Sequence, residues 1–137
     1  MTTINATKAE FVNLINGLFQ VQELKGKKFG LVISKNIATL KKELQHLEDL
    51  GKPSEEFMEL AMKVNEISQS DPENSKEKID KLEKENEELV KLRRDQMDNI
   101  TELMKDKMSI DLKIISEDIL PDDITAKQIN NIEKIIK

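Results

Sequence analysis

The chain has 137 residues, of which 36% are charged and 37% hydrophobic, and it fits one mainly helical domain. It contains no cysteine, which excludes a disulfide scaffold, a thiol nucleophile and any cysteine-liganded metal site. The net charge of −5 argues against a nucleic-acid partner, which requires excess Lys and Arg on one face, and no apolar run is long enough to cross a membrane. The first residues also lack the layout of a signal peptide, so an intracellular protein is expected.

Residues 1–67 are predicted to form an N-terminal helical core. Thr7 and Glu10 form a capping box at the start of the first helix, and Thr2–Asn5 is the candidate for a short strand before it. The predicted core residues, from this helix and the two that follow, are Phe11, Leu14, Leu18, Phe29, Ile33, Ile37, Leu40, Leu44, Phe57, Leu60 and Val64.

The second helix is predicted from Lys27 to Leu50, with Gly51 and Pro53 as its stop signal. Ser54 is the expected N-cap of a third helix. Because the link between these two helices is short, they are expected to fold back on each other as an antiparallel hairpin.

Residues 68–75 are polar and contain Pro72, which predicts a linker or a kink. Residues 76–107 contain no Gly or Pro and predict one long, charged, coiled-coil-like helix. Asn86 occupies the core of its heptad pattern, either as a buried residue that sets register or as an exposed one. The heptad positions are Ile79, Leu82, Asn86, Leu89, Arg93, Gln96, Ile100 and Leu103.

Residues 108–137 are predicted to form a strand and a C-terminal helix in one domain with residues 1–67. Ile110, Leu112 and Ile114 alternate with polar residues, as in a half-buried strand that pairs with the N-terminal strand or adds to the sheet of a partner. Thr125 and Gln128 form the capping box of the last helix.

Catalytic, metal and cofactor-binding residues are not evident. His46 is the only histidine, and scattered carboxylates around it make a poor zinc site. Asp122 and Asp123 lack the ligand spacing of a calcium loop, and residues 26–30 lack the spacing of a phosphate-binding loop. We therefore expect no cofactor and no small-molecule substrate.

Four segments carry a resemblance. They are LINGLFQV at 14–21, VISKNIATLKKEL at 32–44, SIDLKII at 109–115 and LPDDITAKQI at 120–129. This order resembles a family of small tailed-bacteriophage proteins of unknown function. The resemblance implies a phage origin, a gene among the late structural or assembly genes, and localisation in the virion or the host cytoplasm. It implies no catalytic residues.

The sequence thus predicts a mainly α fold with an antiparallel helical hairpin, a long charged helix and a minor two-stranded β element. The expected function is that of a non-enzymatic phage protein that binds itself or other phage proteins, as a virion component or assembly factor. The alternative is an accessory protein that inhibits a host enzyme or defence system, and a metal-dependent enzyme with converging carboxylates is a third hypothesis. The predicted partner-binding residues are Ile79, Leu82, Asn86, Leu89, Ile100, Leu103, Ile110, Leu112 and Ile114.

Overall fold

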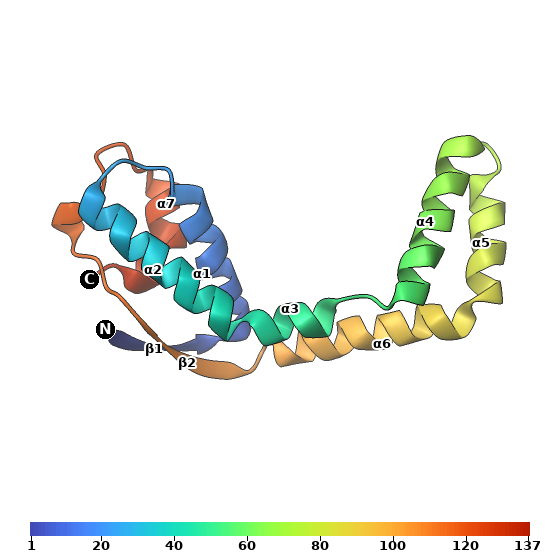
Figure 1. Cartoon of the computed structure of the whole chain (residues 1–137), viewed down its shortest axis with the longest axis horizontal. Coiled ribbons are helices and arrows are strands. Elements are labelled where there is room, and N and C mark those ends of the chain that lie inside the picture. The colour runs from blue at the N-terminus through green and yellow to red at the C-terminus, as the bar shows by residue number, and fades with distance from the viewer. The chain divides into compact units, whose positions relative to one another are not determined.

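The computed structural model describes all 137 residues and confirms a mainly helical chain with one two-stranded antiparallel sheet. It divides into two compact units (Figure 1): unit 1 contains residues 1–47 and 102–137, and unit 2 contains residues 48–101. The elements are β1 (Thr2–Thr7), α1 (Lys8–Val21), α2 (Lys27–Glu43), α3 (Gln45–Gly51), α4 (Glu55–Ser70), α5 (Ser75–Glu85), α6 (Glu87–Leu103), β2 (Lys107–Leu112), α7 (Ala126–Asn131) and the 3₁₀ turns η1 (Glu117–Ile119) and η2 (Glu133–Ile135).

The sheet of unit 1 pairs the N-terminal strand with the strand that follows α6, as the alternating pattern predicts. β1 and β2 run antiparallel, with Ile4 opposite Ile110. One face of the ribbon is apolar and lies against the helices, whereas the other carries hydrogen bonds from Thr3 to Asp111 and from Ser109 to Asn5. This inside–outside alternation fixes the register of the pair.

The helices of unit 1 lie on one side of the sheet (Figure 1). α1 begins with the predicted capping box, in which the Thr7 hydroxyl accepts from Glu10 N–H and the Glu10 carboxylate accepts from Thr7 N–H. α7 begins with the second predicted capping box, between Thr125 and Gln128. The buried apolar core is Ala6, Phe11, Leu14, Ile15, Leu18, Val21, Phe29, Ile33, Ile37, Leu40, Leu44, Leu47, Ile110, Leu112, Ile115, Ile132 and Ile135.

The predicted second helix is interrupted at Leu44, where α2 ends and α3 follows after one residue. Leu44 has φ −97° and ψ 2°, outside the helical range, while its N–H still bonds Leu40 O. The residue itself stays buried in the core, as expected.

The predicted hairpin between the second and third helices is wrong. α4 begins at the expected N-cap, Ser54, but it belongs to unit 2 and pairs with α5, which runs back beside it (Figure 1). Residues 48–67 therefore lie outside the unit that contains residues 1–47. The reason α4 pairs with α5 lies in the segment predicted as a linker, residues 68–75. Only residues 71–74 of it are non-helical, and this tight turn returns the chain along α4.

The single long helix predicted over residues 76–107 is also wrong. It breaks at Asn86 into α5 and α6, which run in different directions (Figure 1). The Asn86 side chain donates to Leu82 O at 2.9 Å and its backbone N–H bonds the same turn, while its carbonyl accepts from Val90 N–H and starts α6. Because Asn readily bonds its local backbone, it ends a helix as easily as it fills a heptad core.

Candidate protein-binding surface

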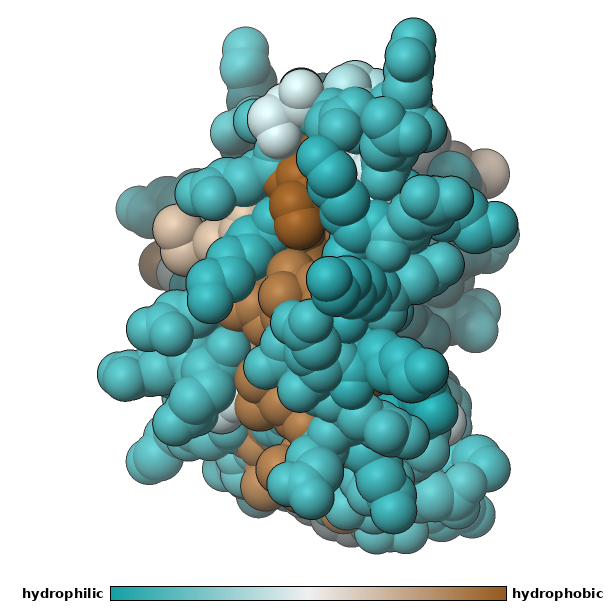
Figure 2. Space-filling model, turned by 90° about the vertical axis from the view of Figure 1, so that its right-hand side faces the viewer, coloured by the Kyte–Doolittle hydropathy of each residue, from teal (hydrophilic) through white to brown (hydrophobic).

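An apolar stripe runs along the α4–α5 hairpin of unit 2. Figure 2 shows a narrow hydrophobic band with hydrophilic residues on both sides. Helical spacing places these side chains on one face of each helix. The half-buried apolar residues of the two helices, here called the α4–α5 stripe, are Phe57, Val64, Ile67, Ile79 and Leu82.

Unit 2 has almost no buried core of its own. Leu60, 6% exposed, is its only buried residue, whereas unit 1 buries all the other apolar core residues. Helices in water gain most of their stability from burying an apolar face. Two paired helices leave part of that face open, so the stripe is apolar surface available to a further element.

A shallow pocket lies at the corner between α5 and α6. Its volume is about 640 Å³, and Glu56 of α4 borders it together with residues 84–89 and Leu92. Four of its lining residues are glutamates, while Leu92 is 66% exposed and supplies an apolar contact point. The pocket therefore combines negative charge with an exposed aliphatic side chain.

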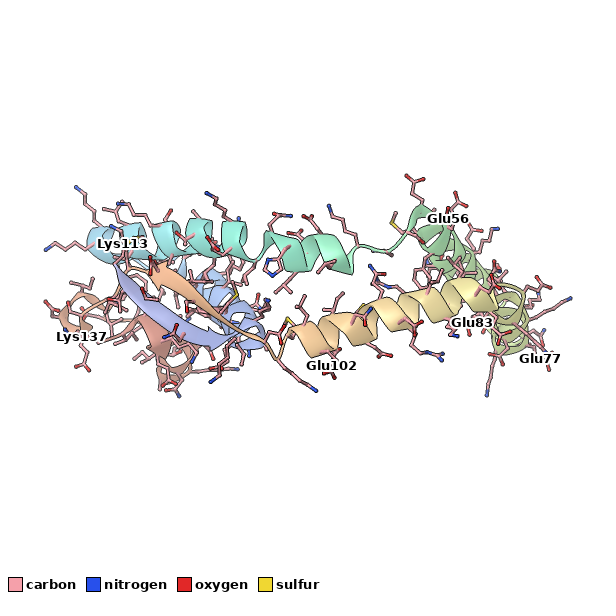
Figure 3. The ribbon with its side chains drawn as sticks, turned by 90° about the horizontal axis from the view of Figure 1, so that it is seen from below. Glu56, Glu77, Glu83, Glu102, Lys113 and Lys137 are labelled. Carbon is pink, nitrogen blue, oxygen red and sulfur yellow. The ribbon has the colours of Figure 1, made fainter.

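The charge of the chain is concentrated in unit 2. Residues 48–101 carry 16 acidic and nine basic side chains, a net charge of −7, whereas unit 1 carries 11 acidic and 13 basic side chains, a net charge of +2. Glu56, Glu77 and Glu83 are exposed and project from the hairpin (Figure 3). A surface of this sign attracts basic partners over a distance of about 8 Å at physiological salt.

The polar residues in the middle of the heptad pattern make hydrogen bonds within unit 2. Arg93 donates to Gly51 O at 2.9 Å, and Gln96 donates to Leu50 O and to Lys52 O. Leu50 and Gly51 are the last two residues of α3 and Lys52 follows it, so Arg93 and Gln96 satisfy acceptors that a helix terminus leaves unpaired. The Arg93 guanidinium also lies 5.7 Å from the centre of the Phe57 ring.

The turn between α4 and α5 is held by an ion pair. Lys78 Nζ lies 2.8 Å from Asp71 Oδ2, and Asp71 N–H bonds Ile67 O. The hydrogen bond from Lys78 lowers the pKa of the Asp71 carboxyl below its ordinary value. The pair connects the end of α4 to the first turn of α5.

The other predicted partner-binding residues fall into three groups. Leu89 is half-buried on α6, and Ile100 Cδ1 would contact a methyl group at Gly51. Leu103 and Ile114 pack against the core of unit 1. Ile110 and Leu112 are buried in that core, 3% and 0% exposed, so their side chains face inward rather than toward a partner.

Part of this surface differs from the prediction. Phe57 and Val64, predicted for the core, are half-buried, and Leu92, which has no predicted role, is exposed. One sequence signal could have indicated this surface. The apolar positions before and after residues 71–74 have helical spacing, so the two segments can pair as α4 and α5. Met58 and Met62, 46% and 64% exposed, add adaptable apolar side chains to α4.

The structure contains no group of three or more His, Asp or Glu side chains placed to hold a metal ion. His46 is exposed. None of the helices combines the length and apolar character that crossing a bilayer requires. Comparison with protein-family models, with curated proteins and with solved structures gave no match.

Proposed function

We propose that the protein acts by binding other proteins, and that the α4–α5 stripe receives an amphipathic helix with basic flanks. The observation that carries this proposal is the burial in unit 2, where Leu60 alone is buried among the apolar residues of α4 and α5. A helix laid along the stripe would cover the remaining apolar face.

The basic character of the partner follows from charge. Unit 2 carries −7, and glutamates surround the exposed Leu92 at its corner. Lysine or arginine beside the apolar contact points of a partner helix would pair with these carboxylates, and an acidic helix would be repelled. The same charge disfavours close packing of two α4–α5 hairpins against each other.

For the biological role we propose a virion component or assembly factor of a tailed bacteriophage. The four-segment resemblance supports this role, and a docking surface fits it better than a catalytic one. Mass spectrometry of purified particles tests it. A stoichiometric amount of the protein in particles is expected, and its absence from particles would instead favour the accessory protein that binds a host target.

Two synthetic amphipathic helices of about 18 residues test the docking proposal, one built from leucine and lysine and the other from leucine and glutamate. Fluorescence anisotropy of the labelled peptides with the full chain should show binding of the basic peptide, weakened by salt, and no binding of the acidic one. Equal binding of both peptides, or of neither, would contradict the proposal.

Paired variants test the location. Val64→Gln places a polar side chain in the stripe. Asn65→Gln, the control, introduces glutamine at the neighbouring exposed position outside the stripe. Val64→Gln should weaken binding of the basic peptide by about tenfold or more, whereas Asn65→Gln should leave it unchanged. Unchanged binding to both variants would place the contact elsewhere.

A further inference from the structure

The two edges of the β1–β2 ribbon in unit 1 are not equivalent. The sheet has only these two strands, so each strand has one edge outside the ladder. On the β2 side, α2 lies alongside, and the Asn36 side chain bonds both the N–H and the carbonyl of Lys113, the residue that follows β2, at 2.9 Å. β1 has no such partner on its outer edge. Figure 3 shows β2 between α2 and β1.

The register identifies which backbone groups β1 presents. Lys8 N–H donates to Asp106 O, in continuation of the ladder that pairs Ile4 with Ile110. In an antiparallel pair, alternate residues exchange both bonds with the opposite strand. The even-numbered residues of β1 therefore bond β2, and Thr3 and Asn5 direct their N–H and carbonyl groups outward. Thr7 follows the same alternation, since its N–H binds the Glu10 carboxylate instead of β2.

The open edge has none of the features that usually block pairing. β1 contains no charged residue and no proline, and its six pairs with β2 run without a bulge. Protein edges that remain single normally carry lysine, proline or a bulge. Thr3 and Asn5 are exposed, and Ile4 is only half-buried although it packs against the core.

We propose that β1 pairs with β1 of a second copy of this chain, antiparallel about a two-fold axis at Ile4, to form a four-stranded sheet. In this register Thr3 of each copy lies opposite Asn5 of the other, and their outward N–H and carbonyl groups make four main-chain hydrogen bonds.

The side chains are self-complementary in the same register. The two Ile4 side chains meet on the apolar face and cover each other's exposed half, and uncharged Thr3 and Asn5 meet on the polar face. Unit 1 carries a net charge of only +2, so repulsion between the copies is small. This interface lies in unit 1 and does not depend on what binds the α4–α5 stripe.

Analytical ultracentrifugation of the full chain, from about 10 µM to about 1 mM, tests the proposal over the range expected for a small interface. Asn5→Pro removes the outward N–H but no ladder bond, and proline is tolerated at an edge whose N–H faces outward. Both Asn5→Pro and Asn5→Ala lose the side-chain hydrogen bond to Ser109, but Asn5→Ala keeps the outward N–H and is therefore the matched control. Thr3→Lys places a charge on the edge without removing any backbone donor.

A monomer–dimer equilibrium is expected in which Asn5→Ala keeps the dissociation constant within about threefold, while Asn5→Pro and Thr3→Lys raise it about tenfold or more. Circular dichroism of each variant verifies the fold, and Thr3→Lys decides the outcome should Asn5→Pro unfold. A monomer throughout the range, or a dimer that Thr3→Lys leaves unchanged, would overturn the proposal. A dimer that is lost in Val64→Gln would place the interface in unit 2 and overturn it as well.

Discussion

The side chain of Asn36 pairs with the backbone of Lys113 as a neighbouring β-strand would. Asn36 Nδ2 donates to Lys113 O and Lys113 N–H donates to Asn36 Oδ1, both at 2.9 Å, and Asn36 is 1% exposed. It is the only buried polar residue of the chain, and both of its polar atoms are satisfied. A residue of α2 thus pairs with the backbone directly after the end of β2.

Replacing Asn36 should be costly. Asn36→Leu keeps a similar volume but leaves the N–H and carbonyl of Lys113 without partners, so we expect a loss of about 2–4 kcal/mol in the free energy of unfolding. Urea denaturation measures this loss. Ser34→Ala, at an exposed position of the same helix, should change stability by less than about 0.5 kcal/mol. Similar values for the two variants would show that the pairing contributes little.

Gly17 is required by the close approach of α1 and α7. A Cβ at this position would lie 2.8 Å from Asn131 O and 2.9 Å from Asn131 Cβ, so Gly17→Ala should destabilise the fold by about 1–3 kcal/mol. Gly30, inside α2, has nothing within 4 Å of its Cβ position, and Gly30→Ala should stabilise by up to about 1 kcal/mol. Thermal unfolding of the two variants tests whether their changes in stability have opposite signs. A stabilising Gly17→Ala would refute the close contact with Asn131.

Glu10 couples stability to acid. Its pKa falls from 4.5 to about 2, first because Lys134 hydrogen-bonds its carboxylate, at 2.7 Å, and then because Thr7 does so. Since the folded pKa lies below the unfolded one, the stabilisation is complete above pH 4.5 and is lost as the pH falls toward 2. Lys134→Gln should raise the pKa of Glu10 toward 4.5 and reduce this acid dependence. An NMR titration of the Glu10 carboxyl measures the pKa, and an unchanged midpoint in Lys134→Gln would refute the pairing.

Arg93 stabilises unit 2 through the end of α3. Arg93→Ala removes the hydrogen bond to Gly51 O and the contact with the Phe57 ring, with an expected cost of about 1–3 kcal/mol. Arg94→Ala removes the same charge from the adjacent exposed position and should cost less than about 0.5 kcal/mol. Denaturation followed by an NMR signal from α4 reports on unit 2, and equal effects of the two variants would contradict the assigned role.

Much of the fold is readable from local patterns. The capping boxes at Thr7 and Thr125 mark two helix starts, and the N-cap Ser54 marks a third. The alternation around Ile110 predicts the strand and its pairing with the N-terminal segment. Each of these helix caps and strand patterns depends on residues close in sequence, and such a local pattern favours one structure over the others.

The misassigned parts depend on choices that local patterns leave open. The apolar face of α4 could pack against α2 or α5, and the turn at residues 71–74 decides in favour of α5. Asn86, Arg93 and Gln96 fit a heptad seam equally well, but each finds a backbone carbonyl of its own unit. The role of Asn36 depends on Lys113, 77 positions away, and no periodicity connects the two.

Amide hydrogen exchange of the full chain, with and without the leucine–lysine peptide, tests the docking function most directly. Alone, α4 and α5 should exchange much faster than α1 and α2, because Leu60 is the only buried residue of unit 2. The peptide should slow exchange in α4 and α5 while leaving unit 1 unchanged. Protection of α4 and α5 that equals that of α1 without the peptide, or that does not respond to it, would contradict the proposed function.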